Sequence, residues 1–155
     1  MKEIHQLIAG AAVGDAITNY AFEICSILTS SGIKSEIFAP YEHTAPELRD
    51  KILPVSEHIS TIYKKEATLL YHFSIGSEIT QHFIQSKAKK ILCYHNITPE
   101  KYFRSISDAR AKILMEGREE LKELKGIPDI VLAVSNFNAR ELEDFGFKNP
   151  IVIPL

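Results

Sequence analysis

The chain lacks a charge excess of either sign and has no apolar run long enough to span a membrane. Its 155 residues hold 18 Lys and Arg against 20 Asp and Glu, which gives a formal net charge of −2. Nucleic-acid-binding proteins usually carry a clear basic excess, so we expect no nucleic acid among its partners. A membrane-spanning helix needs about 20 consecutive apolar residues, and the sequence contains no such run.

Cysteine is also scarce, and the start of the chain carries no secretory signal. Cys25 and Cys93 both lie inside apolar segments, which is typical of buried free thiols in a reducing compartment. Residues 1–5 lead directly into a strand-like segment without the apolar region of a signal peptide. We therefore expect a cytoplasmic protein.

What the chain does contain is ordinary globular composition, with 45% hydrophobic and 25% charged residues. These values exclude wholesale disorder, collagen and low-complexity sequence. The length is that of one domain or one large lobe, and it allows a core without disulfides or metal.

Short apolar runs alternate with helical patterns along the whole chain. The predicted strands cover residues 4–9, 35–39, 67–73, 90–94, 130–134 and 151–153. The predicted helices cover residues 15–32, a short piece at 45–52, 77–86, 99–125 with a break near 105–107, and 135–146. Repeated strand–helix–strand units indicate a parallel sheet with right-handed crossovers. We predict an α/β fold: a three-layer sandwich around a Rossmann-like parallel sheet of about six strands.

Three of these helices are predicted to end in the same way. Gly32, Gly126 and Gly146 are each followed by an apolar residue. Glycine accepts the left-handed conformation that ends a helix, and the apolar residue after it packs back on the last turn.

Small and polar residues gather after the predicted strands. In an open parallel sheet, ligands bind beyond the carboxyl ends of the strands. The candidate binding residues at that edge are Gly14, Asp15, His72, Gly76, Ser77, Asn96 and Ser135, and the candidate catalytic residue is His95.

Each candidate also has a purely structural interpretation. Asp15, Ser77 and Ser135 stand where helix N-caps are expected, and Gly14 can serve a tight turn. The glycines do not have the spacing of the dinucleotide fingerprint, and neither a P-loop nor a G-x-S-x-G elbow is present. His72 and His95 lack the acidic or cysteine partners at the spacing that a metal motif requires, so we predict no metal site.

Five pieces of the chain, the first of them in two parts, resemble a known family in this order. They are residues 5–6, 14–19, 71–77, 94–99, 134–137 and 149–155, and they cover essentially the whole chain. Together they resemble the N-terminal lobe of group 1 (family 4 type) retaining glycosyltransferases of the GT-B architecture.

The resemblance implies two Rossmann-like lobes that face each other across a cleft. The N-terminal lobe mainly holds a sugar or lipid-linked acceptor, the C-terminal lobe holds the nucleotide-sugar donor, and neither a metal nor a cofactor is required. It implies that Gly14 and Asp15 approach the donor diphosphate and that His95 lies near the transferred sugar. Gly76, Ser77 and Ser135 fall on segments that line the cleft.

The chain departs from the family in ending where members cross into the second lobe. We therefore expect residues 1–155 to be an acceptor-side lobe that needs a C-terminal partner lobe, transfers no sugar alone and self-associates through its uncovered surface. The basic cluster Lys87, Lys89 and Lys90 leaves a membrane surface open as a partner. Two alternatives stay open: a non-catalytic Rossmann-like binding module, and one lobe of a GT-B-shaped nucleotide-sugar epimerase.

Overall fold

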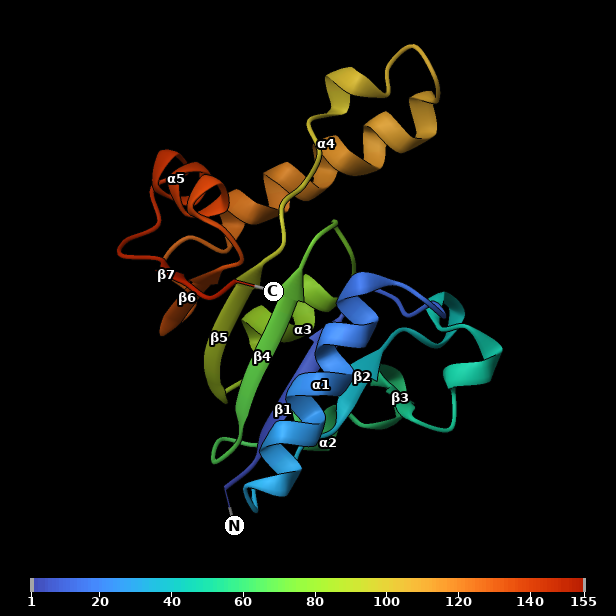
Figure 1. The fold of residues 1–155 in the computed structure, drawn as a ribbon, viewed down its shortest axis with the longest axis vertical. Helices are drawn as coiled ribbons and strands as arrows, with labels where there is room; N and C mark the ends of the chain where they lie inside the picture. The colour runs from blue at the N-terminus through green and yellow to red at the C-terminus, as the bar shows by residue number, and fades with distance from the viewer. Residues whose placement is uncertain (1, 155) are drawn as a thin grey trace.

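Seven parallel strands form one sheet in residues 2–154, the part of the chain that the computed structural model describes (Figure 1). In sheet order they are β3 (Ile52–Pro54), β2 (Ile37–Ala39), β1 (Ile4–Ile8), β4 (Thr68–Phe73), β5 (Lys89–Tyr94), β6 (Ile130–Ala133) and β7 (Ile151–Val152). The chain runs outward from β1 to β3 and then returns to the middle of the sheet at β4. The predicted parallel α/β sandwich is therefore confirmed, with a switch point between β1 and β4.

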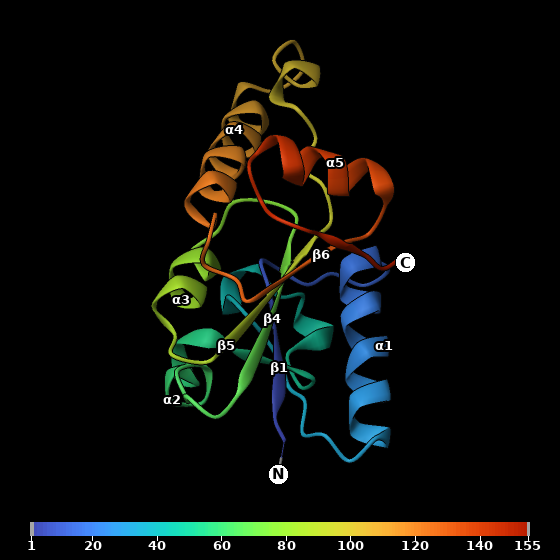
Figure 2. The ribbon, with the colours of Figure 1, turned by 90° about the vertical axis from the view of Figure 1, so that its left-hand side faces the viewer.

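The helices cover the two faces of this sheet unequally. They are α1 (Ala16–Ser30), α2 (Ile59–Ile62), α3 (Ile79–Gln85), α4 (Asp108–Glu123) and α5 (Asn136–Asp144). Figure 2 shows α1 on one side of the sheet and α2, α3 and α4 on the other. Right-handed crossovers explain this split, because the chain crosses the sheet in one direction through α1 and in the opposite direction after β3.

Two apolar cores result, one on each face. The larger core joins the sheet to α2 through α5 and includes the fully buried Tyr71 and Phe73 of β4 and Leu92 of β5. The smaller core lies under α1 and includes Ile8 and Ala21. Successive strand residues point to opposite faces of the sheet. His72, which follows Tyr71 on β4, and Cys93, which follows Leu92 on β5, therefore face the α1 side.

The prediction was wrong about residues 45–54. A short helix was expected at 45–52, whereas this segment contains a 3-10 turn, η2 (Pro46–Leu48), followed by β3. β3 pairs in parallel with β2 and ends in Pro54. Proline cannot donate to a strand ladder and is tolerated at a sheet edge, which is where β3 lies. This edge strand is the seventh strand that the sequence pattern did not reveal.

Two predicted helix caps are confirmed and a third is wrong. The Asp15 carboxylate accepts from Thr18 N at 2.8 Å, and Ser135 Oγ accepts from Asn138 N at 3.1 Å. Ser77 does not cap α3, which begins at Ile79 after an N-cap at Glu78 that makes no side-chain hydrogen bond. A carboxylate from α4 binds the Ser77 backbone instead, as described below.

The predicted break in the long helix is confirmed. A 3-10 turn, η4 (Glu100–Tyr102), precedes the break, and α4 starts after Ser107, whose hydroxyl accepts from Arg110 N at 3.3 Å. The predicted glycine turns are also present, with Gly32 and Gly146 at φ +73° and +86°.

Among the helices of residues 2–154, none combines the length and apolar character needed to cross a membrane. Leu155, which closes the last resembling segment, lies outside the described residues.

Candidate functional site

The carboxyl ends of β4 and β5 bring His72 and His95 together. His72 is the fifth residue of β4 and pairs in register with Cys93 of β5, and His95 follows β5 directly. Cys93 and His95 are two residues apart, so both side chains point to the face that His72 shares. The result is a contact of 3.0 Å between His72 Nδ1 and His95 Nε2, with ring centroids 5.2 Å apart.

A buried chain of hydrogen bonds fixes the tautomers of both rings. Gln6 of β1 donates through Nε2 to the Ala21 carbonyl at 2.9 Å, which leaves its Oε1 to accept from His72 Nε2 at 2.9 Å. His72 Nδ1 is then unprotonated and accepts from His95 Nε2. His95 Nδ1 consequently carries a lone pair, and this buried atom has no hydrogen-bond partner among the described residues.

Burial keeps both imidazoles neutral. It lowers the pKa of His72 to about 3, with a further lowering from neighbouring His95. It also lowers the pKa of His95 to about 4, against an opposing upward effect of the Asp15 carboxylate. Neutral rings are what the alternating donor and acceptor pattern requires, so the hydrogen-bond chain persists at neutral pH.

Tyr20 of α1 covers this pair from the helix side. Its ring lies edge-on to His72 at 5.8 Å and to His95 at 5.7 Å between centroids. Burial is the main cause that raises the pKa of its phenol, so Tyr20 stays protonated. Tyr20 was not among the predicted site residues, because nothing in the sequence distinguishes it from the other residues of α1.

The loop after β1 supplies the second part of the site. Gly14 has φ +80°, a conformation that favours glycine, and Asp15 follows it at the start of α1. The Asp15 carboxylate accepts from both the backbone and the hydroxyl of Thr18, each at 2.8 Å. The N-terminus of α1 therefore points to this edge with its positive dipole partly offset by Asp15.

Two adjoining pockets run along the carboxyl edge. One, of about 310 Å³, is lined by Ala9, Gly10, Ala11, Ala12, Asp15, Ile17, His43, Ser74 and Ile75. The other, of about 420 Å³, is lined by Ala9, His43, Ile75, Gly76, Ser77, Glu78, Ile113, Glu116 and Glu120. His43, which was not among the predicted site residues, lines both pockets.

Gly76 and Ser77 line the second pocket, but their contacts are those of tight packing. A Cβ on Gly76 would lie 2.6 Å from Glu120 Oε1 and 2.9 Å from the Gly117 Cα, so only glycine lets α4 approach here. Glu120 Oε2 accepts from Ser77 N at 3.0 Å and from Thr80 Oγ1 at 2.7 Å. These contacts fix the loop that forms the pocket wall.

Asn96 and Ser135 complete the predicted set. Asn96 has φ +80°, and its buried Oδ1 has no partner among the described residues. It is therefore a second unsatisfied acceptor, next in sequence to His95. Ser135 uses its hydroxyl as the cap of α5, so its contribution to the edge is structural.

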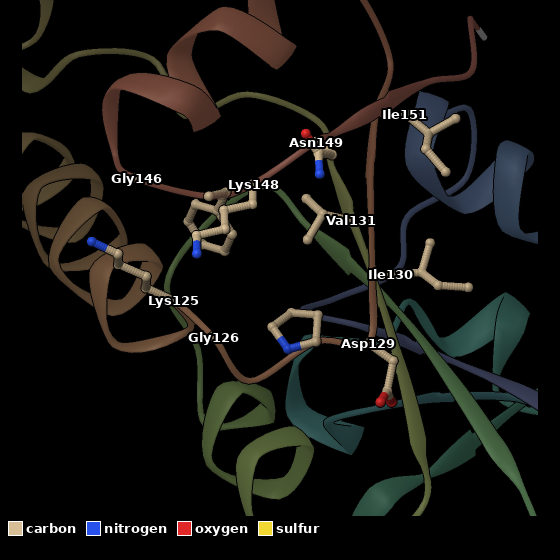
Figure 3. A pocket seen from close by; sticks show the side chains of 11 residues that line it. Lys125, Gly126, Asp129, Ile130, Val131, Gly146, Lys148, Asn149 and Ile151 are labelled. Carbon is tan, nitrogen blue, oxygen red and sulfur yellow. The ribbon is translucent and has the colours of Figure 1, made fainter.

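A further pocket, of about 480 Å³, lies at the opposite edge of the sheet (Figure 3). It is lined by the turns that lead into β6 and β7, with Lys125, Asp129 and Lys148 among its side chains. It contains none of the predicted site residues. We place the candidate site at the carboxyl edge, which holds the histidine pair and the unsatisfied atoms His95 Nδ1 and Asn96 Oδ1; the other buried side-chain atoms without a hydrogen-bond partner among the described residues belong to His5 and Ser35, toward the amino ends of β1 and β2.

The chain matches no protein-family model and no curated protein sequence. The family resemblance therefore rests only on the sequence segments described above.

Proposed function

We propose that this chain is the acceptor-side lobe of a retaining glycosyltransferase of the GT-B architecture, which moves a sugar from a nucleotide-sugar donor. The observation that carries the proposal is the hydrogen-bond chain from Gln6 through His72 to His95. It ends in a buried lone pair on His95 Nδ1 at the carboxyl edge. A buried acceptor without a partner is costly unless a ligand donates to it, and sugar hydroxyls are such donors.

The donor diphosphate would lie at the loop that contains Gly14. Backbone N–H groups at a helix N-terminus attract anions, and the space beside the Gly14 Cα is open, since even a Cβ added there would meet nothing within 4 Å. In a retaining transfer the departing diphosphate gains negative charge while the sugar becomes oxocarbenium-like. Fixed backbone dipoles at this loop would stabilise the charge on the diphosphate, and His95 would hold the sugar in place.

The pocket beside Ser77 supports an acceptor site. Its wall includes Glu78, Glu116 and Glu120, and carboxylate oxygens accept hydrogen bonds from hydroxyls. A hydroxylated acceptor, either a sugar or a lipid-linked sugar, suits this lining better than an anionic one.

The chain alone is expected to bind a nucleotide sugar weakly and to turn none over, because the proposal assigns the base and ribose contacts to a second lobe. Amide NMR spectra of the chain can be titrated with UDP-glucose and GDP-mannose, with UDP, GDP and the free sugars as controls. We expect shifts at residues 10–17 and 94–97 that depend on the sugar. His95→Ala should weaken that binding roughly 2–10-fold, the value of one hydrogen bond.

His58→Ala is the matched control, because His58 contacts Phe38 on the opposite face of the sheet, and it should leave binding unchanged. The proposal fails if no nucleotide sugar shifts the carboxyl edge, or if His95→Ala binds as the original chain does. Shifts that UDP alone reproduces would favour a nucleotide-binding module. Release of UDP or GDP by the chain alone would contradict its role as an acceptor lobe.

A further inference from the structure

The candidate site contains a third side chain that the proposed function does not use. Cys93 of β5 is the in-register neighbour of His72 on β4 and lies two residues before His95. All three side chains point to the α1 face, and their ligating atoms lie within 4.8 Å of one another. Two imidazoles and a thiol are donors that a zinc-class cation prefers.

The spacing of the two facing imidazole nitrogens is close to that of two ligands in a tetrahedral centre. Zn–N bonds of about 2.0–2.1 Å place two nitrogen ligands roughly 3.3 Å apart, and the two facing nitrogens here are 3.0 Å apart. If this pair opens by a few tenths of an ångström and the thiol approaches by about 1 Å, all three atoms reach the bond lengths of a tetrahedral zinc centre.

Gln6 orients His72 as such a centre needs. Histidines that bind metals usually donate their other ring N–H to a fixed acceptor, which sets the tautomer and the ring orientation. His72 donates Nε2–H to Gln6 Oε1, and Ala21 holds Gln6 in turn. His72 Nδ1 is thereby kept as an unprotonated ligand atom.

We propose that His72 Nδ1, Cys93 Sγ and His95 Nε2 bind a zinc-class divalent cation, independently of the proposed transferase function. On binding, Cys93 loses its thiol proton to solvent. The His95 proton moves from Nε2 to Nδ1, the ring atom that otherwise has no partner among the described residues. The Cys93 thiolate together with the Asp15 carboxylate, which acts electrostatically on His95, offsets the two positive charges. The bound cation would replace the hydrogen bond between the two histidines. It would bind His95, the residue that the proposed function assigns to the sugar.

Two further facts bear on affinity. Burial raises the pKa of the Cys93 thiol to about 12, so deprotonation opposes binding. Both imidazoles, in contrast, are neutral at neutral pH and have lone pairs available. Binding should therefore be weaker than at a preformed thiolate site.

Cd²⁺ tests the site, because its bond to a thiolate gives an ultraviolet charge-transfer band. The EDTA-treated chain is titrated with CdCl₂, and ZnCl₂ is added separately in thermal melts. We expect one Cd²⁺ per chain, a charge-transfer band, and a melting temperature that rises with ZnCl₂. Cys93→Ser should abolish the band, and Cys25→Ser, the matched control on α1, should keep it. Gln6→Leu should weaken binding about 10–100-fold as the loss of an orienting residue.

The proposal is overturned if the original chain gives no band at one equivalent, if the band persists in Cys93→Ser, or if the band is lost in Cys25→Ser. If Cys93→Ser does not fold, imidazole ¹⁵N spectra of the original chain decide the matter. Zn²⁺ must then shift His72 Nδ1 and His95 Nε2, and unchanged nitrogens reject the site.

Discussion

The two faces of the sheet differ in what covers them and in the side chains they carry. Toward α2 through α5, the strands present large residues such as Tyr71, Phe73 and Leu92, all fully buried. Toward α1, the central strands present Gln6 and His72, a polar pair linked by hydrogen bonds. The first face supplies most of the apolar burial, and the second holds the candidate site.

The α1 face is also less completely covered. Leu132 of β6 and Ile151 of β7 lie in register with Cys93, beyond the strands that α1 crosses. Ile151 is 54% exposed and Ile153 is 42% exposed. Parallel sheets are usually covered on both faces, so this half of the face is the one on which the predicted self-association would occur. Three substitutions and one pH series can test whether one face provides stability and the other holds the candidate site.

The largest effect is expected in the larger core. Phe73→Ala removes a fully buried ring and should lower the free energy of unfolding by about 3–5 kcal/mol, through lost burial and the cavity left behind. Urea denaturation of the original chain and of Phe73→Ala measures this difference in the free energy of unfolding. Phe137→Ala is the control, because Phe137 is 67% exposed, and it should change stability by no more than about 0.5 kcal/mol. Equal effects of the two substitutions would contradict the division of roles.

The α1 face should make stability depend on pH. The folded-state pKa values of His72 and His95, about 3 and 4, lie below the unfolded value of about 6.5. The unfolded chain therefore binds more protons below that value, and stability falls as the pH decreases from about 6.5 toward 4. The slope should reach up to about 1.4 kcal/mol per pH unit for each histidine.

Urea denaturation between pH 7.5 and 4.5, in EDTA, measures this slope. His95→Asn should flatten it, whereas His58→Asn on the opposite face should leave it as it is. A slope that His95→Asn does not change would show that the buried pair has no part in the acid sensitivity.

A smaller loss is expected when the hydrogen-bond chain is cut at its anchor. Gln6→Leu leaves His72 Nε2–H buried without an acceptor and should cost about 1–3 kcal/mol. Imidazole ¹⁵N spectra should also show His72 leaving its single tautomer. Gln81→Leu, an exposed change on α3, is the control for stability. A stable Gln6→Leu chain with an unchanged His72 tautomer would refute the hydrogen-bond chain.

The smallest effect on stability is expected at the uncovered part of the α1 face. Ile151→Lys should alter the free energy of unfolding by no more than about 0.5 kcal/mol, since the side chain is already half exposed. It should nevertheless weaken self-association in sedimentation experiments, because it places a charge on the apolar patch. Ile106→Lys, at a residue 76% exposed near the start of α4, should not. Equal association of both variants would place the contact elsewhere.

Sequence reasoning succeeded for some elements of both faces and failed for others. The helix α1 was predicted because an amphipathic pattern and the cap residue Asp15 agree, and α4 was predicted from its apolar pattern alone, without its cap Ser107. β3 was missed because Ile52–Pro54 is too short for an alternating pattern and depends on its pairing with β2. Ser77 was predicted as a cap from its position alone, yet Glu120, distant in the sequence, binds its backbone.

The candidate site shows the same division. The order of strands and helices, with small or polar residues after the first, third, fourth and fifth predicted strands, was sufficient to place His72 and His95 at one edge of a parallel sheet. Tyr20, Gln6 and Cys93 join them only through packing, because α1 lies across the strands and the register sets His72 beside Cys93.

By itself, the sequence determined the periodicity, the caps Asp15 and Ser135 and the glycine turns, since these depend on interactions within a few residues along the chain. It thereby determined the α/β class and the edge at which polar side chains gather. Only the tertiary structure decided that His95 Nδ1 has a buried lone pair and that Cys93 faces the same space. The physical reason is that strand register and the crossing of α1 bring together atoms far apart in sequence, and burial then sets their tautomers and pKa values.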